Sequence, residues 1–159
     1  MTLKIGIIGC GGIGTKKHLP ALAQVEGVEI VAFCDLIIER AIEAKEQFGT
    51  QDSQVYIDYR EMLAEVELDI VHVCTPNDTH AELSIAAMEA DNHVMCEKPM
   101  AKTAEEARAM VEVSKRTGKK LTIGYQNRFR QDSQFLHTAV SNGDLGNIYF
   151  AKAHAIRRR

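Results

Sequence analysis

The sequence predicts a doubly wound α/β fold, in which helices cover both faces of a parallel sheet. Short runs rich in Ile, Val and Cys alternate with helical patterns from residue 3 to about residue 125. Parallel strands joined by right-handed helical crossovers are what such alternation normally builds. With 159 residues, a chain buries roughly 70% of its unfolded surface, so the fold needs no disulfide or structural metal.

Five segments have the length and composition of buried parallel strands, namely residues 3–8, 28–34, 69–74, 93–96 and 120–125. Apolar residues at helical spacing run from Ile37 to Phe48 and stop at Gly49, and a second set stops before Gly118. Both glycines are predicted to cap helix C-termini. The second helix also has a specific start, because Thr103 and Glu106 form a capping-box pair.

The last part of the chain predicts the start of a second domain. An amphipathic helix is expected over 133–140, followed by a turn at Asn142-Gly143 and a strand over 148–156. Three arginines at 157–159 then read as a solvated tail. A long unpaired strand at a chain end is a hazard that complete proteins usually cover. We therefore expect a dinucleotide-binding domain over 1–125, and a connecting helix and first strand of a truncated second α/β domain over 126–159.

Composition excludes several classes of function. Nineteen basic and 22 acidic residues give a formal charge of −3, so nucleic acid is not an expected partner. The sequence has no apolar run of the ~20 residues that a membrane span needs, and no secretory signal, so a cytoplasmic protein is expected. The four cysteines form no C-x-x-C pair. We interpret them as reduced thiols and expect no metal site.

A glycine-rich turn follows the first predicted strand. Residues 9–14 read G-C-G-G-I-G and match G-x-G-x-x-G at the start of a helix. The first glycine permits the tight turn, the second lets backbone N–H groups approach a pyrophosphate, and the third lets helix pack on strand. The motif predicts a Rossmann dinucleotide site formed by Gly9, Gly11, Gly12, Ile13 and Gly14. A strand-to-helix turn without a ligand is the alternative.

An acidic residue ends the second predicted strand. Asp35 lies 21 residues after Gly14, the spacing at which a carboxylate accepts hydrogen bonds from the adenosine ribose. Asp35 would repel a 2′-phosphate, and Leu36 stands where NADP enzymes tend to place an arginine or a small polar residue. The cofactor is therefore expected to be NAD rather than NADP. Asp35 can also act as a helix N-cap, with or without that role. The ATP-binding loop motif fails, because Thr15 stands at its lysine position.

Polar residues directly follow the ends of two further predicted strands, those over 69–74 and 93–96. Thr75, Pro76, Asn77 and His80 follow one of them, and Glu97-Lys98-Pro99 follows another. The carboxyl ends of parallel strands in an open sheet border the ligand crevice. These groups are therefore expected beside the glycine turn, where a nicotinamide would lie.

These motifs together resemble the Gfo/Idh/MocA oxidoreductase family. The set is the glycine turn, C-D at 34–35, C-T-P-N-x-x-H at 74–80, C-E-K-P at 96–99 and G-Y-Q-N-R-F at 124–129. The resemblance implies an NAD-dependent dehydrogenase acting on a sugar, inositol or related polyol. It further implies a second α/β domain with a mostly antiparallel sheet, which carries an Asp and a His that this chain does not reach.

The resemblance also implies a role for each matching residue. Lys98 is implied as the catalytic residue, which polarises and orients the reacting oxygen. The implied cofactor contacts are Glu97, Thr75, Pro76, Asn77, His80, Asn127 and Arg128. A surface ion pair is the alternative for Lys98. His18 matches the family's first-helix pattern, whereas His72 is expected to be a hydrogen-bonded core residue.

The sequence thus predicts the cofactor half of an oxidoreductase that moves hydride between nicotinamide and a sugar-like hydroxyl or carbonyl group. We expect the isolated chain to be inactive and the protein to be a homo-oligomer. Two alternatives stay open at this point. One is a regulatory module that binds NAD without turnover, and the other is an S-adenosylmethionine-dependent methyltransferase, against which Glu97-Lys98-Pro99 argues.

Overall fold

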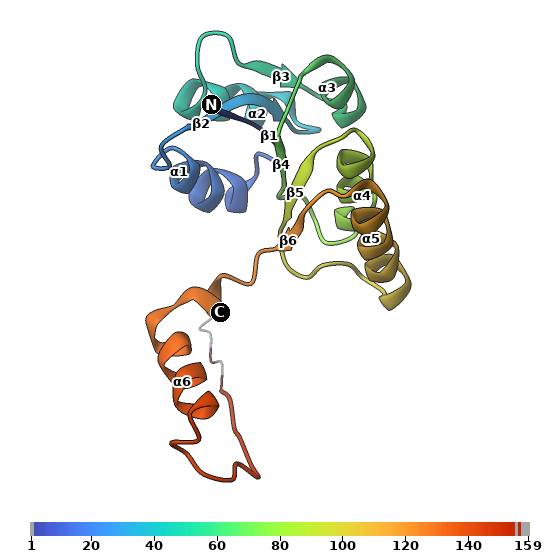
Figure 1. Cartoon of the computed structure of the whole chain (residues 1–159). Helices are drawn as coiled ribbons and strands as arrows, with labels where there is room; N and C mark the ends of the chain where they lie inside the picture. Colours follow the sequence, from blue (N-terminus) through green and yellow to red (C-terminus); the bar gives the residue numbers. More distant parts are fainter. Residues whose placement is uncertain (1, 155, 157–159) are drawn as a thin grey trace. The chain divides into compact units, whose positions relative to one another are not determined.

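The structure is a computed structural model that describes residues 2–154 and 156. It divides into two compact units, residues 1–124 and residues 125–159. The first unit contains a six-stranded sheet of order β3-β2-β1-β4-β5-β6 (Figure 1). Every neighbouring pair of strands is parallel. This is the order of the doubly wound dinucleotide-binding fold, so the predicted fold class is confirmed.

The strands are short, as predicted. They are β1 (Leu3–Ile8), β2 (Val28–Cys34), β3 (Gln54–Tyr56), β4 (Ile70–Val73), β5 (His93–Cys96) and β6 (Leu121–Ile123). The helical elements of this unit are η1 (Gly14–His18), α1 (Leu19–Leu22), α2 (Ile38–Phe48), α3 (Tyr59–Glu65), α4 (His80–Glu89) and α5 (Ala104–Thr117).

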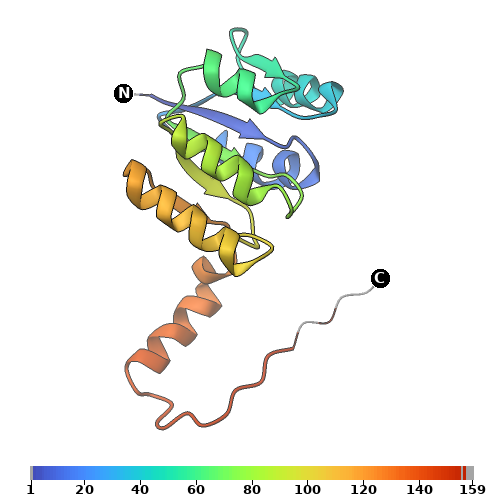
Figure 2. The same cartoon turned by 90° about the vertical axis from the view of Figure 1, so that its right-hand side faces the viewer.

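Two hydrophobic clusters cover the two faces of the sheet. Successive residues of a strand point to opposite faces, and Ile7 and Ile8 of β1 accordingly belong to different clusters. The cluster around Ile8 includes residues of α3, α4 and α5, and Figure 2 looks onto the face that these helices cover. The cluster around Ile7 includes residues of α1 and α2. The sheet is therefore buried on both faces, which leaves the strand ends as the place for a site.

The predicted helix ends differ in their geometry. Thr103 and Glu106 form the predicted capping box, and Gly118 caps the other end of α5 with a left-handed φ of +70°. Gly49 follows α2 as its C-cap, but its backbone is extended. A Cβ at Gly49 would lie 2.9 Å from the Phe33 ring, so close packing explains the glycine there.

The second unit contains η2 (Gln126–Phe129) and α6 (Gln131–Ser141). The strand predicted over 148–156 is wrong where it is described, because residues 148–154 and 156 have no regular secondary structure. Strands need hydrogen-bonded neighbours, and the described part of this unit has no other strand to pair with. Arg157, Arg158 and Arg159, predicted to be a solvated tail, lie outside the described residues. Across the described chain, no helix is long and apolar enough to cross a membrane.

Candidate cofactor-binding site

A cleft of about 730 Å³ lies at the carboxyl ends of β1, β2 and β4. The strand order reverses between β1 and β4, and such a switch point is where open α/β sheets bind ligands. The cleft brings together residues from three of the predicted motifs. They are Gly9, Gly11, Gly12 and Ile13 of the turn, Asp35, and the Thr75-Pro76 pair.

The glycines of the turn divide into two kinds. Gly9 has a φ of +98°, and a Cβ there would lie 2.7 Å from the Cys74 carbonyl carbon. A Cβ at Gly14 would collide with the Gly9 carbonyl oxygen. Gly11 and Gly12 differ, because a Cβ at either position would meet no protein atom within 4 Å. Packing of the chain therefore requires Gly9 and Gly14, whereas Gly11 and Gly12 leave room in front of the backbone for a ligand.

The helical segment that opens at the glycine turn has a wide π-helical form from Gly14 to His18. η1 spans five residues and continues directly into α1, where Pro20 occupies the first turn. Proline has no N–H and cannot continue the regular hydrogen-bond pattern backwards, which accounts for the irregular turn before it. Thr15 closes the segment onto the glycine turn through its N–H, 2.9 Å from the Gly11 carbonyl oxygen. The free N–H groups at the start of such a segment favour an anion.

The Asp35 carboxylate supports the turn and the next helix at once. One oxygen accepts the Cys10 N–H at 2.9 Å, and the other accepts the Ile37 N–H at 2.9 Å. Arg40 lies 4.0 Å from the second oxygen. Ile37, not Asp35, is the N-cap residue of α2. Each carboxylate oxygen has two lone pairs, so these contacts leave acceptor capacity for ribose hydroxyls in the cleft.

The residues after β4 lie in different environments. Thr75 and Pro76 line the cleft, and Asn77 is exposed. His80 is fully buried, and its ring nitrogens lie 2.7 Å from the Pro99 carbonyl oxygen and 3.0 Å from the Thr75 carbonyl oxygen. A neutral ring has one N–H and donates to one of these two acceptors. The ring therefore lies between the loops that follow β4 and β5. Direct contact of Asn77 and His80 with a cofactor stays a prediction.

Glu97 and Lys98 follow β5 and differ in exposure. Lys98 is exposed, whereas Glu97 is 7% exposed and accepts the Lys98 N–H at 3.0 Å. The Lys98–Pro99 peptide bond is cis. Asn127 and Arg128 are exposed residues of η2 in the second unit. Their role as cofactor contacts, like those of Glu97 and Lys98, stays a prediction.

The cysteines near the site are held as thiols. Burial, with the Asp35 charge as the second cause, raises the pKa of Cys10 and of Cys34 to about 12. Burial also raises the pKa of Cys74 and brings that of Cys96 to about 11. All four cysteines are free and buried. None is a thiolate at neutral pH, so packing explains their positions. Among the described residues, no group of three or more His, Cys, Asp or Glu side chains is placed to hold a metal ion.

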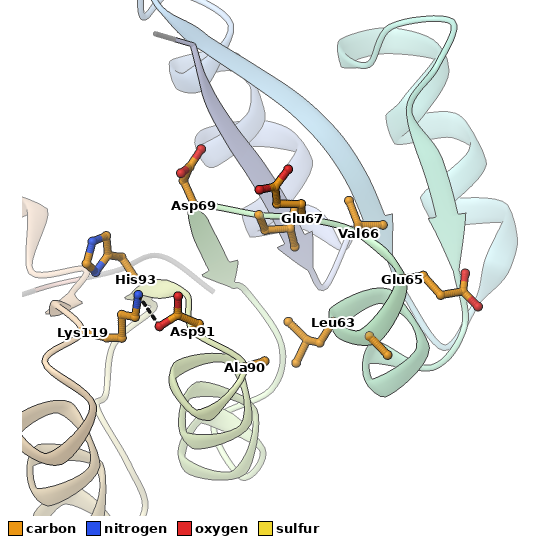
Figure 3. A pocket seen from close by; sticks show the side chains of 11 residues that line it. Leu63, Glu65, Val66, Glu67, Asp69, Ala90, Asp91, His93 and Lys119 are labelled. Atoms are coloured by element: carbon orange, nitrogen blue, oxygen red, sulfur yellow. Dashed lines mark ion pairs between the residues drawn. The ribbon is translucent and has the colours of Figure 1, made fainter.

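A second pocket, of about 530 Å³, lies by the amino ends of β4 and β5 (Figure 3). Acidic side chains line it together with His93 and Lys119, and Lys119 pairs with Asp91 at 2.6 Å. It contains none of the residues predicted for the site. The pocket provides an internal comparison for ligand-binding experiments.

A partly buried histidine of β4 predicts a pH dependence of folding. Burial, and after it the neighbouring His18, lowers the pKa of His72 from 6.5 to about 4. The unfolded chain therefore binds more protons between these values, and stability falls as the pH drops through that window by up to about 3 kcal/mol. Urea unfolding at pH 7 and pH 4.5 measures this loss. His72→Gln is expected to reduce it, and an equal loss in that variant would contradict the assignment.

The site and fold together define a doubly wound domain of the dinucleotide-binding class, with its cleft at the switch point of the sheet. The family model described as "Oxidoreductase family, NAD-binding Rossmann fold" (GFO_IDH_MocA) matches residues 3–125. The chain belongs to this family, as the sequence motifs predicted. The prediction of NAD as the cofactor is confirmed at the level of the family.

Individual relatives are sugar and inositol dehydrogenases by name. The chain is 40% identical to D-glucoside 3-dehydrogenase of Escherichia coli over 156 residues, 98% of this chain and 44% of the relative. It is 35% identical to inositol 2-dehydrogenase of Salmonella paratyphi B over 92% of this chain and 44% of the relative. The WlbA dehydrogenase of Bordetella pertussis, solved with NADH and UDP-GlcNAcA, superposes with a TM-score of 0.87 at 29% identity, covering 94% of this chain and 45% of that structure. The chain thus spans less than half the length of these relatives.

Proposed function

We propose that this chain holds NAD for hydride transfer to or from a sugar-like or polyol substrate. The observation that carries the proposal is the open backbone at Gly11 and Gly12, beside the Asp35 carboxylate in one cleft. The protein has no packing reason to keep glycine at these two positions, and a pyrophosphate needs that space. Family membership supports the same conclusion.

The cleft residues fit the parts of a dinucleotide. The Gly11 and Gly12 backbone would hold the pyrophosphate, and Asp35 would accept hydrogen bonds from the adenosine ribose. Leu36, 87% exposed, and Ile57, 52% exposed, line the same cleft and offer apolar surface to a flat ring. When bound, NAD supplies the hydride acceptor, and the reduced form supplies the donor.

Lys98 is proposed to act on the substrate. Lys98 comes directly after Glu97 at the carboxyl end of β5, and its side chain is exposed. There its ammonium group can polarise the reacting oxygen of the substrate and donate a hydrogen bond or a proton to it. The remaining proposed contacts are Thr75, Pro76, Asn77, His80, Glu97, Asn127 and Arg128. Relatives named for glucosides and inositols support a substrate with several hydroxyl groups.

The organisation of the protein follows from the same proposal. Residues 126–159 are proposed to belong to a separate substrate-binding part, because the family model ends at residue 125. A homo-oligomer is proposed, since Phe129, Phe135 and Tyr149 of the second unit are at least 77% exposed, and large apolar side chains are typical of interfaces. The free buried thiols support a cytoplasmic location.

Substitution of Asp35 tests the cofactor assignment. The wild-type chain is expected to bind NAD at least about tenfold more tightly than NADP, because the carboxylate repels a 2′-phosphate. Asp35→Ala should narrow that ratio, as measured by calorimetry at low salt. Asp35→Asn is the matched control, since it removes the charge but keeps one carbonyl acceptor for the Cys10 or Ile37 N–H. Equal affinity of the wild-type chain for NAD and NADP would contradict the assignment.

A further inference from the structure

Three polar side chains from distant parts of the chain contact one another next to Lys98, in the loop that follows β5 (the Lys98 loop). They are His18 of η1, His72 of β4 and Glu97 after β5. Nε2 of His18 lies 3.0 Å from Oε1 of Glu97, and Nδ1 of His18 lies 2.9 Å from Nδ1 of His72. His18 is 9% exposed and Glu97 is 7% exposed. We call these residues the His18 cluster.

The contacts restrict where protons lie in the His18 cluster. A carboxylate only accepts hydrogen bonds, so Nε2 of His18 carries a proton when Glu97 is ionised. If His18 is neutral, its Nδ1 accepts the Nδ1–H of His72. If His18 is protonated, its Nδ1–H donates to His72, whose own proton then lies on Nε2. In both arrangements His72 needs only one ring proton, and Glu97 receives a hydrogen bond from His18.

The second oxygen of Glu97 connects the cluster to Lys98. It accepts the Lys98 backbone N–H at 3.0 Å, so both carboxylate oxygens of Glu97 have partners inside the protein. Gly124, directly after β6, packs against the Glu97 side chain, because a Cβ at Gly124 would lie 3.2 Å from Oε1 of Glu97. The rotamer of Glu97 is therefore fixed by hydrogen bonds and by packing.

The loop is held on its other side as well. The Pro99 carbonyl oxygen lies 2.7 Å from Nδ1 of the fully buried His80. The Lys98 backbone thus lies between two residues that contact buried imidazoles, Glu97 with His18 and Pro99 with His80. Its side chain remains exposed. These contacts hold the backbone of Lys98 in place, while its ammonium group is exposed and accessible to a substrate.

The stability of the fold alone does not explain why the His18 cluster consists of buried polar side chains. Burying a hydrogen-bonded charged group costs desolvation free energy, and apolar side chains of similar volume are often as stable or more stable. His18 also lies four residues after Gly14 in the helical segment that opens at the glycine turn. The hydrogen bond to Glu97 therefore links the proposed pyrophosphate site to the Lys98 loop.

We propose that His18 is a positioning residue, which orients the Lys98 backbone through the Glu97 carboxylate. The proposal rests on the proposed function only for the role of Lys98 in turnover. The hydrogen-bond chain from His18 to the Lys98 N–H is a property of the protein without its cofactor, so it can be tested separately.

Two variants that differ by one methylene test the chain. In His18→Gln the side-chain amide reaches toward the position of Nε2 and can donate to Glu97, whereas in His18→Asn it lies near the position of Nδ1 and cannot. Hydrogen exchange of the Lys98 amide in the NAD-free chain is expected to stay near the wild-type rate in His18→Gln. In His18→Asn it is expected to be about tenfold faster. An unchanged rate in His18→Asn would overturn the proposal.

A measurement on the wild-type chain applies even if a variant does not fold. Ring-nitrogen NMR shifts at neutral pH are expected to show a proton on Nε2 of His18. An unprotonated Nε2 would overturn the proposal, because His18 would then have no proton to donate to Glu97. NAD titration of the same sample tests the proposed function independently of this result.

Turnover separates positioning from general support of the fold. In a chain that spans the whole length of its relatives, His18→Asn is expected to lower kcat about tenfold and to leave the KM for NAD unchanged. His18→Gln is expected to restore most of kcat. Equal loss of kcat in both variants, together with a raised KM for NAD, would show a structural role only and contradict the proposal.

Discussion

Replacing Gly11 with valine is expected to weaken NAD binding by about 100-fold, or about 2.7 kcal/mol. A Cβ at Gly11 meets no protein atom within 4 Å, so the branched side chain would enter the space that the pyrophosphate needs. The sheet should fold unchanged. Calorimetry measures the loss of affinity, and circular dichroism with thermal unfolding checks the fold.

Gly14→Val is the matched control for Gly11→Val. A Cβ at Gly14 collides with the Gly9 carbonyl oxygen, so this variant is expected to lose stability by several kcal/mol and not only affinity. The two glycines belong to one motif, yet Gly11→Val is expected to lower NAD affinity, whereas Gly14→Val is expected to lower the stability of the fold. Wild-type NAD affinity in Gly11→Val would refute the placement of the pyrophosphate.

Lys98→Ala is expected to lower kcat by about 100-fold to 1000-fold in a chain that spans the whole length of its relatives. The affinity for NAD should stay within about threefold of wild type, because the ammonium acts on the reacting oxygen more than on the dinucleotide. Stopped-flow hydride transfer together with calorimetry separates these two quantities.

Lys98→Arg is the control for charge at this position. It keeps the positive charge but changes the shape and the acidity of the group, so kcat should recover only in part. The isolated 159-residue chain is expected to bind NAD without turnover. Reduction of NAD by that chain with a polyol would contradict the proposal that turnover needs a separate substrate-binding part in addition to the cofactor-binding part.

Local sequence signals predicted the parts of the fold that depend on neighbouring residues. The capping box at Thr103 and Glu106 is one such part. α4 was not predicted individually, because it packs between other elements and buries six of its ten residues. Its apolar residues therefore do not form a single stripe. β3 has three residues, too few to show a period.

In the site, too, the features that depend on local sequence patterns could be predicted and those that depend on distant residues could not. That the glycine turn and Asp35 line one cleft could be predicted because their spacing along the chain is a recognisable motif. The link from His18 to Glu97 joins residues 79 positions apart. His72, the other partner of His18, was predicted to be a hydrogen-bonded core residue, but its partner was not predicted. No local pattern indicates that such residues share hydrogen bonds. The predicted strand over 148–156 was wrong in the described residues because a strand depends on partners that its own sequence does not reveal.

The most direct test of the account is a backbone amide NMR titration of the chain with NAD. Binding at the switch point predicts shift changes at Gly11, Gly12, Asp35 and Thr75, with residues around Lys119 unaffected. The pocket around Lys119 lies by the amino ends of β4 and β5 (Figure 3), so it serves as the reference within the same spectrum. Saturable shift changes that gather around Lys119 and leave the glycine turn unmoved would contradict the assignment of the cofactor site.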